Sequence, residues 1–176
     1  MTNKFEHVTI NQFAKDWINT FEDNDTLMSY VKESKLGEIL NGIHLPNRAT
    51  SKSAGYDFYS PMNFVLQPRQ TIKIPTGIKC SIKENCVLQI YPRSSMGFKY
   101  RLRLDNTVGI IDSDYYNNSN NEGHIFIKVT NEGDEILKIA TGDRFAQGIF
   151  IAYDITEDDV INDDVVRIGG IGSTDK

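Results

Sequence analysis

The stretch TIKIPTGIKCSI, residues 71–82, contains two short runs in which apolar and polar side chains alternate. The turn sequence Pro-Thr-Gly separates the two runs. The apolar side chains fall on every second position: Ile72, Ile74, Ile78, Cys80 and Ile82. Because successive side chains of a strand point to opposite faces of a sheet, this pattern predicts two short strands, each with one buried face.

The same alternation extends outward from this stretch over residues 43–153. Ile125, Ile127 and Val129 form a further alternating set. Turn sequences interrupt the runs at residues 84–85, 131–133 and 141–143. Many short strands at regular spacing are typical of a sandwich, a jelly roll or a barrel, so we expect an all-β core over residues 43–153.

Residues 1–42 have a helical pattern instead. The sequence TINQ at residues 9–12 has the form of a capping box, and apolar residues continue from it at helical spacing: Ile10, Phe13, Trp17 and Phe21. A second helix is expected to begin at Asp25 or Thr26 and to end near residues 41–42. We expect a small helical N-terminal extension with a structural role, because no pattern within it indicates chemistry.

The composition limits the classes of function. The 176 residues fit one domain with a short extension, and the formal net charge of −5 argues against a nucleic-acid-binding surface. No apolar run reaches the roughly 20 residues that span a membrane, and the N-terminus lacks the pattern of a signal peptide. Cys80 and Cys86 have no zinc-site spacing, so we expect two free thiols in a cytoplasmic protein.

The segment YPRSSMG, residues 91–97, has the composition of an anion-binding loop. Arg93 carries a fork of donors suited to phosphate oxygens, and Ser94 and Ser95 add hydroxyl and backbone donors. Gly97 permits close approach of a ligand to the backbone. Short strings of this kind also occur in plain surface loops, so both interpretations stay open for this segment alone.

The segment NTVGIIDSDY, residues 106–115, runs from an apolar strand directly into acidic residues and a tyrosine. Asp112 and Asp114 are two positions apart and would share a face if the strand continued. A carboxylate beside an apolar wall is suited to act as a general base, and Tyr115 could cover a sugar or a base. A strand followed by an ordinary acidic turn fits the pattern equally well.

Three further segments carry weaker signals: SAGYD at residues 53–57, GDRFAQ at 142–147 and RIGGIGST at 167–174. Asp57 could face a metal or its water shell, and Arg144 and Gln147 could contact phosphate. The glycines after Arg167 could let the backbone wrap a phosphate chain as a flexible lid over residues 154–176. Each segment also fits an ordinary loop, turn or tail.

In their order and spacing, these five segments resemble the five motifs of the homotrimeric dUTPase family, and the likeness covers residues 43–174. The long asparagine-rich stretch at residues 116–123 is similar to versions from Gram-positive bacteria and their phages. The resemblance implies a jelly-roll-like subunit of β-clip type, and a homotrimer with shared active sites. It also implies hydrolysis of dUTP to dUMP and pyrophosphate, which limits uracil incorporation into DNA and supplies dUMP for dTMP synthesis.

The resemblance further implies a role for individual residues. Asp112 would be the general base for water attack on the α-phosphate, and Tyr115 would pack against the deoxyribose. The uracil pocket would consist of these residues: Asn106, Gly109, Ile110, Ile111 and, with less support, Phe126. The phosphates would contact another set: Arg93, Ser94, Ser95, Gly97 and Gln147, with Arg144 as a possible brace through an ion pair. The lid would contribute four more: Arg167, Ile171, Gly172 and Ser173. Mg²⁺ would be held mainly by the triphosphate, so Asp57 would act on it only through water.

The sequence departs from the family pattern in the last motif and at the N-terminus. Ile171 stands where an aromatic residue is usual, and one residue separates Arg167 from the paired glycines where two are common. These changes leave open a regulatory or partner-binding protein with this fold, with the N-terminal extension contacting a protein partner. A dCTP deaminase is less favoured, because no glutamate follows the third motif until Glu122.

Overall fold

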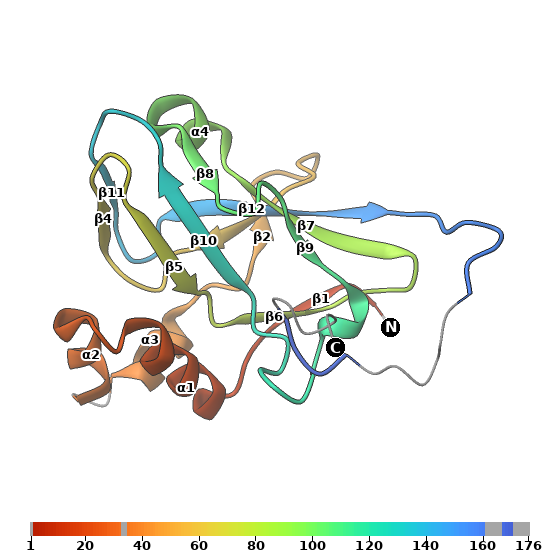
Figure 1. Cartoon of the computed structure of the whole chain (residues 1–176), viewed down its shortest axis with the longest axis horizontal. Coiled ribbons are helices and arrows are strands. Elements are labelled where there is room, and N and C mark those ends of the chain that lie inside the picture. Colours follow the sequence, from red (N-terminus) through yellow and green to blue (C-terminus); the bar gives the residue numbers. More distant parts are fainter. Residues whose placement is uncertain (1, 33–34, 161–166, 171–176) are drawn as a thin grey trace.

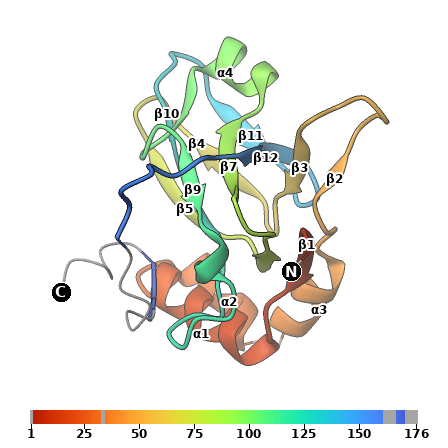
Figure 2. The ribbon, with the colours of Figure 1, turned by 90° about the vertical axis from the view of Figure 1, so that its right-hand side faces the viewer.

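The computed structural model describes residues 2–32, 35–160 and 167–170. Antiparallel strands form the body of the molecule, and a group of short helices lies beneath one end of it (Figure 1). The view turned by 90° shows the same separation, with the helices below the sheets (Figure 2). The predominance of strands confirms the prediction of an all-β, jelly-roll-like fold with a minor helical part.

The largest sheet has five strands in the order β2-β3-β12-β7-β9. Its strands are β2 (Asn47–Arg48), β3 (Tyr56–Tyr59), β12 (Arg144–Ala152), β7 (Cys86–Pro92) and β9 (Gly109–Ile111). A three-stranded sheet has the order β5-β10-β8, with β5 (Thr71–Pro75), β10 (Phe126–Asn131) and β8 (Leu102–Leu104). Two pairs complete the body: β1 (Lys4–His7) with β6 (Ile78–Ser81), and β11 (Leu137–Ile139) with β4 (Phe64–Leu66).

The alternating runs that predict strands do bury one face each. Ile127 lies opposite Ile74 in the pairing of β10 with β5, and both are almost fully buried. The turn at residues 75–77 does not close a hairpin, because β5 and β6 belong to different sheets. Gly77 has a φ of +74°, which a residue with a side chain rarely adopts, so this position turns the chain from one sheet to the other.

The N-terminal segment differs from the expected helical extension. Within residues 2–32 and 35–42, which the structure describes, there are three helices, α1 (Ile10–Phe21), α2 (Asp25–Lys32) and α3 (Leu36–Gly42), where the sequence predicts two. Lys4–His7 form a strand that the sequence pattern does not predict. Phe5 is buried in β1 and lies opposite Cys80 of β6, so this strand depends on a partner far along the chain.

Helix α1 packs its apolar face into the main core. Thr9 caps it by accepting a hydrogen bond from the Gln12 backbone N–H at 3.2 Å. Phe13 and Trp17 are fully buried in the same hydrophobic cluster as the strands, whereas Ile10 is 44% exposed. The helix is therefore part of the protein's core.

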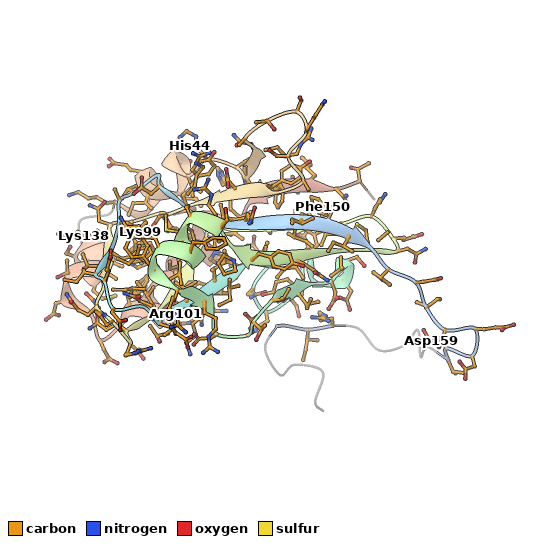
Figure 3. The ribbon with its side chains drawn as sticks, turned by 90° about the horizontal axis from the view of Figure 1, so that it is seen from above. His44, Lys99, Arg101, Lys138, Phe150 and Asp159 are labelled. Carbon is orange, nitrogen blue, oxygen red and sulfur yellow. The ribbon has the colours of Figure 1, made fainter. Side chains whose placement is uncertain are left out.

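The segment after β12 leaves the sheets. Figure 3 shows Asp159 well outside the body of the molecule, on the chain that continues β12 beyond Phe150. Residues 167–170 lie against the segment that follows β9, where Arg167 pairs with Asp112 and Asp114 and the Ile168 carbonyl accepts from the Asn120 N–H. Among the described residues, none of the helices has the length and apolar character needed to cross a membrane.

Candidate active site

A pocket of about 290 Å³ opens beside β9. It brings together seven of the residues that the sequence singles out: Asn106, Gly109, Ile110, Ile111, Tyr115, Phe126 and Arg167. Ile90, Leu104 and Gly170 complete its lining. The lining combines apolar side chains with polar groups, so the polar groups can orient a ligand while the apolar walls exclude water.

The position of β9 gives this pocket its donors and acceptors. β9 is the last strand of the five-stranded sheet, and it pairs on one side with β7. An edge strand leaves backbone N–H and C=O groups on its other side free to bind a ligand. Gly109 lies opposite Ile90, and an added Cβ would come within 3.0 Å of the Ile90 Cβ. Glycine therefore lets the start of β9 lie close against β7.

Asp112 follows β9 at the rim of the pocket. Strand β9 ends at Ile111, and Ser113–Tyr115 form a short 3-10 helix, so Asp112 and Asp114 do not share a strand face as the sequence pattern suggests. Both carboxylates nevertheless bind one cation. The Arg167 Nη2 lies 2.8 Å from the Asp112 Oδ2, and the Arg167 Nε lies 2.9 Å from the Asp114 Oδ1.

Tyr115 is held firmly at the wall of the pocket. Its hydroxyl donates to the backbone carbonyl of His124 at 2.8 Å and accepts from the Asn121 Nδ2 at 2.7 Å. The side chain is buried, and burial raises the pKa of the Tyr115 phenol above its usual value. The hydroxyl therefore stays protonated and keeps its donor role.

A second cluster lies at the end of β7. Arg93 follows Pro92 and is the residue before α4 (Ser94–Tyr100), so Ser94 and Ser95 stand at the start of that helix, with Gly97 in the next turn. The first N–H groups of a helix have no partner within it and attract anions. Gln147 in β12 lies opposite Tyr91 of β7, and its Nε2 donates to the Pro92 carbonyl at 3.1 Å.

Asp57 connects the arginines of this cluster. Its carboxylate lies 2.9 Å from the Arg93 Nε and 3.2 Å from the Arg144 Nη1, and its side chain is 8% exposed. The sequence analysis expects Asp57 to contact magnesium through water. In the structure both oxygens of the Asp57 carboxylate instead form ion pairs with arginines. Among the described residues, no group of three or more Asp, Glu, His or Cys side chains is arranged to hold a metal. The side chains in the described part of the chain therefore do not fit a magnesium ion held by the protein alone.

Replacing Asp57 with asparagine should lower the melting temperature. The change removes a buried charge from two arginines, but Arg144 is 44% exposed, so we expect a loss of about 1–3 kcal/mol, below that of a fully buried pair. Thermal unfolding followed by circular dichroism would measure it. Glu132→Gln is the control, because Glu132 pairs with an arginine that is 55% exposed. Equal melting temperatures for the two variants would contradict this role of Asp57.

The two clusters do not meet within one chain. Ile111 lies opposite Leu88 near the start of β7, whereas Arg93 follows its last residue. At about 3.3 Å per residue, Asp112 and Arg93 are separated by roughly 15–20 Å along the strand. Three predicted residues, Ile171, Gly172 and Ser173, lie outside the described residues.

The sequence pattern misses several polar residues that support the pocket. Asp16, His124 and Asn121 are buried near Tyr115, and Glu122 is half-buried beside them. Only the asparagine-rich stretch at residues 116–123 signals that this loop is unusual. Asp16 lies on α1, more than a hundred positions away in the sequence, so no local pattern connects it to the pocket.

Comparisons with known proteins point to one family. A family model described as dUTPase matches residues 41–175. The chain is 42% identical over 133 residues to the deoxyuridine 5'-triphosphate nucleotidohydrolase of Lactococcus lactis subsp. lactis (strain IL1403), covering 76% of this chain and 89% of that protein. The protein of the same name from Haemophilus influenzae (strain PittEE) is 37% identical over 136 residues, covering 76% of this chain and 84% of its own length.

Solved structures agree with these relatives. A crystal structure of dUTPase from Streptococcus mutans is 33% identical and superposes with a TM-score of 0.62, covering 87% of this chain and 98% of that one. The dUTPase from phage phi11 of S. aureus is 23% identical, with a TM-score of 0.56 and coverage of 69% and 90%. At that identity, the phage protein supports the fold alone.

Proposed function

The chain belongs to the dUTPase family and is a dUTP nucleotidohydrolase, and we propose that Asp112 is the general base that activates water against the α-phosphorus of dUTP. The observation that carries this role is the position of Asp112. It directly follows Ile111, which lines the pocket beside β9, and it pairs with Arg167, which lines that pocket too. A carboxylate at such a rim can take a proton from water while the neighbouring pocket holds the nucleotide.

The pocket beside β9 is the site for uracil and deoxyribose in this proposal. The free edge of β9 presents backbone donors and acceptors from Gly109 to Ile111, which can match the edge of uracil and leave the reversed pattern of cytosine unpaired. Asn106 and Phe126 line the same pocket. Tyr115 packs against the deoxyribose and leaves no space for a 2′-hydroxyl.

The cluster at the start of α4 binds the phosphates. Arg93 supplies a positive charge, Ser94 and Ser95 supply helix N-terminal donors, and Gln147 lies beside them. Asp57 and Arg144 orient Arg93 through the shared ion pairs. Mg²⁺ bound to the triphosphate would offset phosphate charge, and we assign none of this chain's residues as its direct ligand.

We propose a homotrimer with shared active sites, and the separation of the two clusters supports a site built from more than one chain. If Asp112 and Arg93 act on one nucleotide, they come from different chains, since within one chain they lie at opposite ends of β7. Phe98 on α4 is 91% exposed, and Ile110 at the base pocket is 51% exposed. Apolar side chains exposed at both half-sites are suited to burial against a second copy.

Arg167 acts in the lid. In the described structure it pairs with Asp112 and Asp114, and Gly170 lies against the Tyr115 ring, where an added Cβ would be 3.2 Å from its Cε2. We propose that Arg167 leaves these carboxylates and binds the γ-phosphate of dUTP when the lid closes over the nucleotide. The release leaves Asp112 free to bind water.

Replacing Ile171 with phenylalanine should strengthen the lid. An aromatic side chain would stack on uracil, so we expect KM for dUTP to fall or kcat to rise by about two- to tenfold. Steady-state kinetics on both proteins would measure the change. Unchanged kcat and KM would contradict a contribution of position 171 to substrate binding.

The proposed function is tested by substrate selectivity. We expect pyrophosphate release from dUTP in the presence of Mg²⁺, and little from dTTP, dCTP or UTP. Release of ammonia from dCTP would instead indicate a deaminase. A regulatory protein that has lost catalysis would bind dUTP without releasing pyrophosphate. A protein partner for residues 1–42 stays a prediction. Phe13 and Trp17 of α1 face the core, so such a partner would meet the exposed side chains of the helix, which include Ile10 and Ile18.

A further inference from the structure

A buried carboxylate and histidine connect helix α1 to the base pocket. The Asp16 Oδ2 lies 2.6 Å from the His124 Nδ1. Asp16 is 7% exposed and His124 is fully buried. Asp16 belongs to the N-terminal segment outside the residues that the family model matches, whereas His124 lies two residues before Phe126, the first residue of β10.

The hydrogen bonds fix the protonation of this pair. The Gly77 backbone N–H donates to the His124 Nε2 at 2.8 Å, so Nε2 is the acceptor and Nδ1 carries the proton that is donated to Asp16. Burial lowers the pKa of His124, which favours the neutral ring. The Gln12 Nε2 also donates to the Asp16 Oδ2, at 2.9 Å. Both ring nitrogens are satisfied, and the ring has one orientation.

His124 in turn contacts both aromatic residues of the pocket. Its backbone carbonyl accepts the hydrogen bond from the Tyr115 hydroxyl at 2.8 Å. Its ring packs on Phe126 with 4.7 Å between centroids, and on Phe13 of α1 with 6.1 Å. A shift of His124 would therefore displace the carbonyl that holds the Tyr115 hydroxyl and, at the same time, the ring that packs on Phe126.

A second set of contacts ties the same loop to the start of α1. The Glu122 carboxylate accepts hydrogen bonds from the Thr9 backbone N–H at 3.0 Å and the Thr9 hydroxyl at 2.6 Å. Lys15 donates to the Asn120 carbonyl at 3.2 Å. Both views show this loop, after the 3-10 helix, reaching down to α1 (Figures 1 and 2). The loop at residues 116–123 is thus hydrogen-bonded to α1 and its cap, and it also donates a hydrogen bond to Tyr115 through Asn121.

We propose that Asp16 is a positioning residue for the nucleotide pocket, which acts through His124 to hold Tyr115 against the sugar. The N-terminal segment then contributes to the discrimination of dUTP from UTP, because a displaced Tyr115 leaves space for a 2′-hydroxyl. This inference rests on the proposed role of Tyr115. A pair that only stabilised the core would affect folding and leave the choice of nucleotide unchanged.

The test is the ratio of kcat/KM for dUTP to kcat/KM for UTP, measured with the full chain. Asp16→Ala removes the acceptor of the buried Nδ1–H, and we expect the ratio to fall by about tenfold or more. Asp16→Asn keeps a neutral acceptor and should give an intermediate ratio, lower by about threefold. Phe21→Leu is the matched control, because Phe21 is buried on the same helix and packs on Trp17. It should lower the melting temperature and leave the ratio unchanged.

A fourth variant separates this inference from the proposed function. Tyr115→Ala should abolish most of the discrimination between the two nucleotides. If it does, and the ratio stays at the wild-type value in Asp16→Ala, the inference is overturned while the role of Tyr115 stands. If Asp16→Ala does not fold, an unchanged ratio in Asp16→Asn overturns it equally. If Tyr115→Ala keeps the wild-type ratio while dUTP is still hydrolysed, the role of Tyr115 and the inference both fail.

Discussion

Replacing Asp112 with asparagine should lower kcat for dUTP by a factor on the order of 10²–10⁴, the usual effect of losing a general base. The barrier would rise by about 3–5 kcal/mol. KM should change only a few-fold, because the base pocket and the phosphate cluster keep their residues. Pyrophosphate release under saturating dUTP would measure kcat, and dUTP binding to the variant would show that the site is intact.

Asp114→Asn is the matched control for this prediction. Asp114 is two positions away, is 58% exposed and contacts the same Arg167, so the change removes a charge of the same sign beside the same cation. We expect kcat within about fivefold of the wild type, since Asp114 lies in the 3-10 helix beyond Asp112 and its exposed ion pair is screened by solvent. A similar loss of kcat in both variants would mean that catalysis depends on negative charge near Arg167, and it would contradict the role of Asp112 as the general base.

Two inactive variants should restore activity to each other when they are refolded together. Arg93→Gln removes the positive charge from the phosphates, and we expect kcat/KM to fall by on the order of 10²-fold, as for the loss of one preorganised donor. Asp112→Asn should be inactive for a different reason, because it removes the proposed general base beside the pocket at β9 and leaves the cluster at the start of α4 intact. In randomly mixed trimers, about a quarter of the sites would combine an intact Asp112 with an intact Arg93 from another chain.

A gain of activity on co-refolding the two variants would therefore show that residues of different chains form one active site. Co-refolded Arg93→Gln and Asp112→Asn should reach about a quarter of the wild-type rate, whereas the two proteins refolded separately and then assayed together should stay inactive. A control mixture of Arg93→Gln with Ser94→Ala should show no gain over the two proteins refolded separately, because both residues belong to the cluster at the start of α4 and come from the same chain. No gain in the first mixture, with trimers present, would contradict a site shared between chains.

The strands of this fold could be predicted from the sequence because their signal is local. Alternation at Ile72 and Ile74, and at Ile127 and Val129, follows directly from one buried face on each strand. The pairing of these strands could not be predicted, since nothing local indicates that β5 lies beside β10 and not beside β6. Strand β1 was missed for the same reason, because its partner is distant in the sequence.

The candidate site shows the same limit at the level of side chains. The sequence singles out Asp112, Tyr115 and Arg93 as candidates because each belongs to a short motif with a recognisable pattern. Asp16 and His124 belong to no such motif, and their 2.6 Å hydrogen bond exists only because α1 packs beneath the loop that precedes β10. The ion pair of Arg167 with Asp112 likewise depends on where the end of the chain folds back.

Hydrolysis of dUTP by the wild-type protein in ¹⁸O-labelled water tests the central claim most directly, because the label marks the phosphorus that water attacks. We predict rapid turnover of dUTP with one ¹⁸O atom in the phosphate of dUMP and none in pyrophosphate. Label in pyrophosphate would mean attack at the β-phosphorus and would contradict the placement of Asp112 beside the α-phosphate. No turnover of dUTP by the folded protein would contradict the assignment of this chain as a dUTP nucleotidohydrolase.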